Sequence, residues 1–524
     1  MTVPGSIAIR NGTVLDGLGG EPFVADVLIE GDRIARIGHV EPAGEEVDAS
    51  GRFVAPGFID IHSHSDFTLL VDPRAVSAIH QGVTLEVIGN CGYGCFPIGC
   101  ASRAARAIYG YDAAVGTTWR TAAEYFDVLE AARPAVNVVS LVPNGQLRLA
   151  TVGFADRPAH DDELRAMTYL LEESLEQGAW GFSTGLEYAQ EVGASEFELT
   201  TLAAASARRG GIYATHTRRR DTGSADAVDE AVRTARAAQA RLQVSHLVPR
   251  SGLDESRRCT AVVDDAAQSG LDVAFDMHTR LYGTTYLHTV LPPDILAAPP
   301  EEQERLLGDL ETQREIRSFE SILSAGRDWS RVVLLDNDVV PECARLDIAT
   351  LAHRAGLDPV ALICELLIKA LPDTGRLMVV NHCYTELQQR EAFAHPLCMP
   401  GSDATTLAPD GPLACSTFHG AYTWAAWFYR FTTVQERILT PAEAVRRLTS
   451  VPAERVGLPG RGVLRPGAAA DVVVFDPASL MEVGTLDEPN QLARGVEHVF
   501  VNGVHALSHG SLTGERAGRV LRKT

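Results

Sequence analysis

Eight short apolar runs recur along the middle of this chain, and stretches with the periodicity of amphipathic helices lie between them. Residues 162–178 and 198–211 are two such stretches, and the second closes on glycine, as helix C-termini often do. Strands and helices that alternate eight times predict an α/β protein built around a (β/α)8 TIM-like barrel of parallel strands. The candidate strands are residues 58–62, 84–89, 136–142, 179–183, 212–216, 242–246, 272–277 and 397–402.

The two ends of the chain have a different texture from the middle. Residues 4–57 alternate apolar and polar positions in short runs between Gly-Asp and Asn-Gly turns, which is typical of a small antiparallel sheet. The same texture returns from about residue 461. We therefore expect residues 1–57 and 461–524 to build one small β-sandwich domain, which brackets a barrel domain formed by residues 58–460.

The connection between the seventh and eighth candidate strands, about 120 residues, is far longer than a normal loop. It contains the charged amphipathic stretch 299–323, so we expect an inserted lid at about residues 290–395. Charged helices of this kind can equally face a partner subunit, which leaves a homo-oligomer open. Two further strand-like runs, 331–335 and 377–380, compete for positions in the barrel.

Composition excludes several classes of partner. The formal net charge is -22, with 46 basic and 68 acidic residues, which disfavours nucleic acid and anionic membranes. The sequence has no basic segment followed by an apolar leader and no long uncharged apolar stretch, so we expect a soluble, cytoplasmic protein. Nine cysteines without regular spacing do not predict a disulfide framework. They fit a reducing compartment in which a cysteine can serve as a metal ligand.

Residues able to bind zinc follow five of the candidate strands, whose carboxyl ends converge on one face of a barrel. Imidazole, thiolate and carboxylate are the ligand types that zinc prefers. Each residue alone is more often a core or capping residue, and the acidic one can form a simple turn. Their joint occurrence at one face favours a metal site. These residues are His62, His64, Cys91, His216, His246 and Asp403.

The motifs around these residues follow one another in a fixed order along nearly the whole chain. They are APGFIDIHSHSD (55–66), GVTLEVIGNCG (82–92), GFSTGLEY (181–188), GGIYATHTR (210–218), VSHL (244–247), HPLCMPGSD (395–403) and GAAADVVVFD (467–476). In this order they resemble the amidohydrolase superfamily and, within it, the D-aminoacylase branch, whose members are N-acyl-D-amino-acid deacylases.

The resemblance implies roles for the zinc-binding residues. Cys91, His216 and His246 would hold one tightly bound Zn²⁺, and His62, His64 and Asp403 would frame a second, weaker position. Many superfamily members use a carboxylated lysine at the fourth strand, but GFSTGLEY has none. Cys91 would take over that ligand role, as it does in this branch.

The expected chemistry is hydrolysis of an amide-type C–N bond in a small N-acylated substrate. Zinc lowers the pKa of bound water from 15.7 to roughly 7 and polarises the carbonyl, and Asp403 can pass a proton to the leaving nitrogen. The leading hypothesis is an N-acyl-D-amino-acid deacylase. A cyclic-amide hydrolase or deaminase of the same superfamily is an alternative, and a non-catalytic scaffold is a remote one because no ligand is missing.

The substrate side departs from the branch pattern. Val248 stands where the branch usually has a lysine that binds the substrate carboxylate, and STFHGAYTWAAWFYR (416–430) replaces an arginine-bearing segment. Candidate replacement cations are Arg250 and Arg280, although a structural ion pair is as good an interpretation of each. We also consider His278 as a contact to substrate, as a metal ligand or as a hydrogen-bonded barrel residue. Tyr188 and Tyr282 could donate to the developing oxyanion or simply pack.

Overall fold

A closed barrel of parallel strands forms the centre of the computed structural model, which describes residues 5–323 and 327–524. One set pairs in the order β6-β7-β8, and another runs from β9 through β10, β11, β12 and β13 to β17. Strands β8 and β9 are consecutive, and a parallel bridge between Ser63 and Ala404 joins the first strand to the last. The predicted barrel is therefore confirmed. Its strands are β6 (Phe58–Asp60), β7 (Val83–Ile88), β8 (Asn137–Ser140) with β9 (Val142–Pro143), β10 (Gly181–Gly185), β11 (Ile212–His216), β12 (Arg241–Val244), β13 (Val273–His278) and β17 (Cys398–Gly401).

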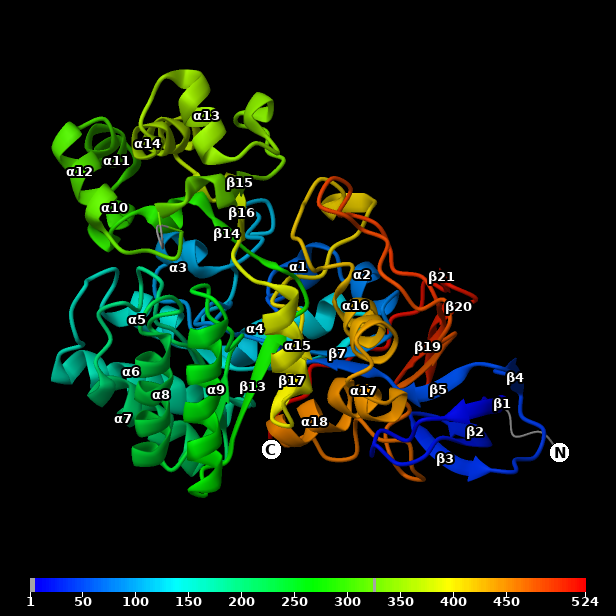
Figure 1. Ribbon diagram of the computed structural model, residues 1–524. Helices are drawn as coiled ribbons and strands as arrows, with labels where there is room; N and C mark the ends of the chain where they lie inside the picture. The colour runs from blue at the N-terminus through cyan, green and yellow to red at the C-terminus, as the bar shows by residue number, and fades with distance from the viewer. Residues whose placement is uncertain (1–4, 324–326) are drawn as a thin grey trace.

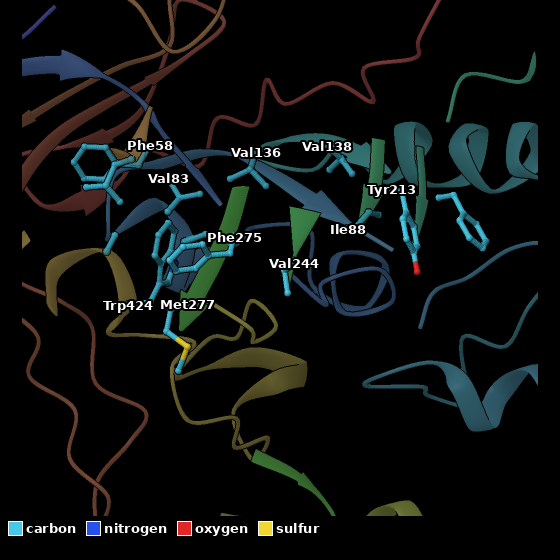
Figure 2. Packing of buried hydrophobic residues seen from close by; sticks show 14 of the residues in the cluster. Phe58, Val83, Ile88, Val136, Val138, Tyr213, Val244, Phe275, Met277 and Trp424 are labelled. Atoms are coloured by element: carbon cyan, nitrogen blue, oxygen red, sulfur yellow. The ribbon is translucent and has the colours of Figure 1, made fainter. Parts of the chain in front are cut away.

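Helices cover the outside of the barrel (Figure 1). Their first turns carry the expected caps: Thr121 and Glu124 form a capping box at α4, and Ser195 caps α7. Apolar side chains on the outer faces of the strands, such as Val138, Val244 and Phe275, pack in one large core with these helices (Figure 2). The barrel helices include α4 (Ala122–Ala132), α5 (Asn144–Thr151), α6 (Asp161–Glu176), α7 (Glu196–Arg208), α8 (Ser224–Ala238), α9 (Leu253–Gln268), α15 (Glu386–Ala394), α16 (Trp424–Arg430) and α17 (Pro441–Leu448).

The inside of the barrel is apolar at one end and polar at the other. Ile59, Leu85 and Met399 belong to an interior cluster that also contains Val456 and Leu458, at and just beyond the end of α18 (Ser450–Val456). These side chains fill the amino-terminal end of the barrel. The candidate metal-binding side chains lie at the other end, near the carboxyl ends of the strands, where short helices α1 (Thr68–Val71), α2 (Val76–Ile79) and α3 (Ala101–Ala104) follow β6 and β7.

Both termini contribute to the predicted β-sandwich. Strand β5, from the N-terminal part, pairs antiparallel with β18 from the C-terminal part, and Val54 faces Val474 in this ladder. One face of this sheet closes on an apolar core that includes Ile9, Ile29 and Phe500. The strands are β1 (Ser6–Val14), β2 (Phe23–Glu30), β3 (Arg33–Gly38), β4 (Glu45–Asp48), β5 (Phe53–Pro56), β18 (Val472–Phe475), β19 (Val496–Val501), β20 (Val504–Ser508) and β21 (Ser511–Leu512).

The long connection after β13 forms a compact body of its own (Figure 1). It has a three-stranded antiparallel sheet in the order β14-β16-β15, so the runs 331–335 and 377–380 do not compete for the barrel. Helix α15 packs on α9, β13 and β17 and is a barrel helix, so the last part of the predicted 290–395 lid segment lies outside this insertion. Its elements are β14 (Tyr282–Tyr286), α10 (Pro293–Ala297), α11 (Pro300–Leu307), α12 (Leu310–Ser318), β15 (Val332–Leu334), α13 (Ile348–Ala355), α14 (Pro359–Ala370) and β16 (Met378–His382).

Within the described residues, no helix is both long enough and apolar enough to span a membrane. All nine cysteines are free thiols.

A buried ion pair ties α5 to α7 and gives a prediction on stability. Arg148 Nη1 lies 2.6 Å from Glu198 Oε1, and the two side chains are 0% and 1% exposed. Arg148→Met leaves the Glu198 carboxylate buried without its cation, so we expect the free energy of unfolding to fall by about 3–5 kcal/mol. Thermal unfolding measures the change. The control Arg208→Met breaks a surface pair with Glu172, 62% and 39% exposed, and should change the unfolding temperature little. Equal unfolding temperatures for Arg148→Met and wild type would contradict this assignment.

Candidate metal centre

The six candidate ligands, drawn from five different strand ends, converge at the polar end of the barrel. His62 Nε2 lies 3.1 Å from Cys91 Sγ, and Cys91 Sγ lies 3.5 Å from His246 Nε2. Asp403 Oδ1 lies 3.6 Å from His62 Nε2 and 3.4 Å from His64 Nε2. The structure therefore brings together residues that are up to 341 positions apart in the chain.

The ligand atoms form two groups that share one residue. His62, His64, Cys91 and Asp403 make the first group, and Cys91, His216 and His246 make the second. In each group the ligand atoms lie within 4.8 Å of one another. Cys91 thus lies between two candidate metal positions.

Three of these residues adopt a backbone conformation that non-glycine residues rarely use. The φ angles are 52° at Cys91, 34° at His246 and 44° at Asp403. Left-handed backbone at such residues costs on the order of 1–3 kcal/mol and persists only where the surroundings enforce it. Gly185 leaves room for the backbone at Cys91, because a Cβ atom there would lie 2.0 Å from the Cys91 carbonyl oxygen. Local backbone strain at these three residues therefore accompanies the orientation of their side chains toward the centre.

Asp276, inside β13, orients two of the histidines, His62 and His246. Its Oδ1 accepts hydrogen bonds from His62 Nδ1 and from the His246 backbone N–H, both at 2.9 Å. Its Oδ2 accepts one from Gln243 Nε2 at 2.9 Å. Since the Nδ1 atom of His62 is occupied, Nε2 is the nitrogen left to face Cys91, and this arrangement is typical of metal-binding histidine.

Glu187 holds the third histidine. His216 Nε2 lies 2.7 Å from Glu187 Oε2, while Arg250 Nη2 donates to Glu187 Oε1 at 2.6 Å. Burial opposes ionisation of Glu187, but Arg250 and His216 hold its pKa below the usual range. Burial lowers the pKa of His216 to about 4, so its imidazole is neutral near pH 7. A histidine can bind a metal only when its imidazole is neutral.

The unpaired ring nitrogen of His216 fits a bound metal. His216 Nδ1 is buried and has no hydrogen-bond partner among the described residues. In His216 the other nitrogen is engaged by Glu187, so Nδ1 is the atom available to a ligand. Buried polar atoms are nearly always satisfied in native proteins. The donor set of imidazole, thiolate and carboxylate is the one that zinc prefers.

An aromatic wall made of Tyr93, Tyr109, Tyr188 and Tyr286 closes over the centre. The Tyr109 ring lies 4.8 Å from the His64 ring and stacks on Tyr286, from the insertion, at 5.0 Å. The Tyr93 ring contacts Tyr109 at 4.5 Å and Tyr188 at 4.8 Å. Tyr109 and Tyr286 also line a cavity of about 1100 Å³ between the insertion and the loops that follow β7 and β17. The wall therefore lies between this cavity and the candidate ligands.

Two of the five predicted substrate contacts, Tyr188 and Arg280, lie next to candidate ligands, and a third, His278, is buried at the end of β13. The Tyr188 ring packs on His216 at 4.9 Å, although no hydrogen bond of its hydroxyl group to a ligand is found. Arg280 Nη2 donates to the Asp403 backbone oxygen at 2.6 Å and lies 3.4 Å from Asp403 Oδ2. His278 is buried, and both ring nitrogens lack a hydrogen-bond partner among the described residues.

The other two predicted contacts are engaged elsewhere. Arg250 pairs with Glu187 and with Asp221, whose Oδ2 lies 2.7 Å from Arg250 Nη2. Tyr282, at the start of β14, has its hydroxyl group 3.3 Å from His419 Nδ1. The Arg250 guanidinium thus already has two carboxylate partners, and Tyr282 belongs to the insertion.

Sequence reasoning missed four groups at this site: Asp276, Glu187, Arg220 and Tyr384. Asp276 lies inside β13, where a charged residue interrupts an apolar run, and it could have been noticed for that reason. Glu187 follows β10 directly before Tyr188, and it could have been found by the strand-end criterion that selected Asp403. Arg220 is the last of three consecutive arginines, and Tyr384 follows an insertion strand, so neither carried a signal.

Comparisons with known proteins agree with this geometry. The chain matches the profile described as "Amidohydrolase family" over residues 45–306 and 401–506. It is 34% identical to N-acyl-D-glutamate deacylase of Alcaligenes xylosoxydans xylosoxydans over 99% of this chain and 96% of that protein. It is 32% identical to D-aminoacylase of the same organism over 99% and 98% of the two chains. Among solved structures, N-acyl-D-glutamate deacylase from Bordetella bronchiseptica, complexed with zinc and a phosphonate inhibitor, is 30% identical with a TM-score of 0.82 over 99% of each chain.

Proposed function

The chain belongs to the amidohydrolase family, and from this premise we propose that it hydrolyses the amide bond of N-acyl-D-amino acids at the centre formed by His62, His64, Cys91, His216, His246 and Asp403. The observation that carries the proposal is the convergence of these side chains into two groups that share Cys91. The D configuration and the acylated amino group are those of the relatives named deacylases.

Zinc is the metal that we propose for this centre. We assign one tightly bound ion to Cys91, His216 and His246, and a weaker position to His62, His64 and Asp403 beside the same thiolate. A zinc-phosphonate complex of a relative supports the choice of metal, and the two ligand groups support two positions. When bound, zinc would supply a nucleophilic hydroxide at neutral pH and polarise the scissile carbonyl.

The protein side chains have separate tasks in this reaction. Asp403 can accept a proton at a carboxylate oxygen and deliver it to the leaving amide nitrogen, which leaves poorly without one. Asp276 and Glu187 keep the histidine rings in orientation through the hydrogen bonds described above. Arg280 holds the Asp403 backbone in its left-handed conformation. The tyrosine wall keeps bulk water away from the centre, which strengthens every electrostatic interaction there.

The test is a panel of N-acetyl and N-formyl amino acids, offered as matched D and L pairs together with hydantoins as cyclic amides. We expect release of the free amino acid from D substrates and much slower release from their L partners. The Asp403→Asn variant serves as the inactive control. Turnover of the cyclic amides without any turnover of the acyl amino acids would replace this function by that of a cyclic-amide hydrolase.

We also propose that the insertion, residues 282–382, acts as a lid that selects the substrate. The support is the stack of Tyr286 on Tyr109, which in turn contacts His64. Tyr286→Ala should raise KM by about 10-fold, since one aromatic pair and its buried area are lost, and change kcat much less. Tyr286→Phe is the matched control, because it keeps the stack. Steady-state kinetics on substrates with different acyl groups measure the effect, and unchanged KM and preference in Tyr286→Ala would contradict a lid.

The cytoplasmic location and a homo-oligomer stay predictions. The nine free thiols are consistent with a reducing compartment.

A further inference from the structure

Among the described residues, Arg220 is the one buried arginine that forms no ion pair with a carboxylate. The other buried arginines are Arg148, Arg280, Arg447 and Arg455, and each forms an ion pair with an aspartate or a glutamate. Arg220 is 6% exposed and forms no ion pair. A buried charge is costly unless an opposite charge compensates it. An arginine in this situation therefore points to an anion that is not part of the chain.

The donors of Arg220 are only partly used, and only by neutral acceptors. Nη2 donates to the backbone oxygens of His246, at 2.6 Å, and Val248, at 3.1 Å, and to the Tyr384 hydroxyl at 3.0 Å. Nε is buried without a partner among the described residues. No hydrogen bond of Nη1 to any described residue is found. A guanidinium has five N–H donors in a planar fork that matches a carboxylate.

The position of Arg220 connects this unused charge to the metal centre. Its Nη2 contacts the main chain of His246, a candidate ligand, and its own backbone N–H donates to Glu187, which holds His216. The Arg220 guanidinium thus contacts the main chain of one candidate ligand, His246, and the Arg220 backbone is connected to another, His216, through Glu187.

A second unpartnered polar group lies beside it. The His278 ring packs against the Tyr384 ring at 4.9 Å, and Tyr384 accepts the hydrogen bond from Arg220. Both nitrogens of His278 are buried and have no hydrogen-bond partner in the part of the chain that the structure describes, although His278 ends a barrel strand at the polar face. An imidazole offers an N–H donor for a carboxylate oxygen. Arg220 and His278, which both have unused donors, thus contact the same residue, Tyr384.

We infer that Arg220, Tyr384 and His278 form the subsite that binds the carboxylate of the N-acyl amino acid. The inference rests on the proposed function, from which it takes the class of ligand. Arg280 and Arg250 are less suited, because Asp403 occupies the first and Glu187 and Asp221 occupy the second. Arg220 then determines specificity for acids over uncharged analogues, while Asp403 and the ligands determine the rate of bond cleavage.

The test compares each N-acyl amino acid with its carboxamide, which has the same shape without the charge. For Arg220→Met, we expect kcat/KM on the acid to fall by about 10- to 100-fold, the scale of a lost hydrogen bond between charged groups. On the carboxamide, kcat/KM should stay within about 3-fold, a difference under 1 kcal/mol. Arg220→Lys should restore part of the preference for the acid, because the charge is kept. Arg250→Met is the matched control and should change both substrates by the same factor.

A binding measurement separates recognition from chemistry. In the Asp403→Asn background, calorimetry with the N-acetyl amino acid should show a Kd that is about 10- to 100-fold weaker once Arg220→Met is added. If Arg220→Met folds poorly, Tyr384→Phe replaces it in this measurement. Tyr384→Phe keeps the ring, removes only the hydroxyl that accepts from Arg220, and should weaken binding in the same direction.

The possible failures are distinguishable. Equal losses on acid and carboxamide in Arg220→Met, or an unchanged Kd, would overturn the subsite while leaving the deacylase function in place. A selective loss in Arg250→Met, with none in Arg220→Met, would move the subsite to Arg250. If the wild-type protein turns over neither substrate, the proposed function fails, and the choice of a carboxylate ligand fails with it.

Discussion

Asp403→Asn is expected to lower kcat by about 10²-fold or more, the scale of lost general acid–base catalysis. Asparagine has the same shape as aspartate, so the hydrogen bond from Arg280 to the main chain at residue 403 is kept. The amide cannot accept the proton that must reach the leaving nitrogen. The fold and the metal held by Cys91, His216 and His246 should persist, because Asp403 belongs to the other group.

Steady-state kinetics and metal analysis of the same preparation check this result. Asp410→Asn is a suitable control. Asp410 is an exposed aspartate in the segment after β17, and it pairs with Arg74. It should leave kcat unchanged. Near-normal turnover in Asp403→Asn would assign the proton transfer to another residue.

Cys91→Ala is expected to remove the tightly bound metal and with it nearly all activity. Loss of a residue that only supports a ligand already costs about 10- to 100-fold in metal affinity, and Cys91 is itself the ligand that both groups share. His216 and His246 would be left with too few donors for a closed zinc site. We therefore expect the zinc content to fall below about a tenth of that of the wild type at equal free zinc.

Cys95→Ala is the matched control for this prediction. Cys95 is a buried cysteine four positions further along the same loop, but it packs in the large apolar core and belongs to neither ligand group. It should keep its zinc. If the two variants retain the same amount of metal, the assignment of Cys91 as the shared ligand is wrong.

The barrel could be predicted because parallel strands are buried on both faces and therefore consist of continuous apolar runs. Each predicted run overlaps an observed strand, for example 242–246 with β12 and 272–277 with β13. The runs 331–335 and 377–380 have the same texture but pair in the insertion, since apolar content does not specify the partner of a strand. The predicted lid segment 290–395 includes helix α15, which packs on the barrel strands β13 and β17, because a helical sequence does not specify which body the helix covers.

The convergence of the candidate ligands could be predicted because each lies at or shortly after the end of a barrel strand. The residues that support them could not be predicted so easily, since their role depends on contacts between different loops. Three consecutive arginines illustrate the limit: Arg218 pairs with Glu230, Arg219 is exposed, and Arg220 is buried without a carboxylate. In the sequence they are equivalent members of one basic run. Only the fold distinguishes the buried cation from its neighbours.

The most direct test of a metal-dependent hydrolase is to measure metal content and turnover on one preparation of the wild-type protein. The geometry predicts between one and two zinc ions per chain, since two ligand groups share Cys91. Removal of the metal by a chelator should abolish hydrolysis of N-acyl-D-amino acids, and added zinc should restore it. Full hydrolytic activity in protein that holds less than about a tenth of an equivalent of metal would contradict the central claim, because zinc sites of this kind act only when occupied.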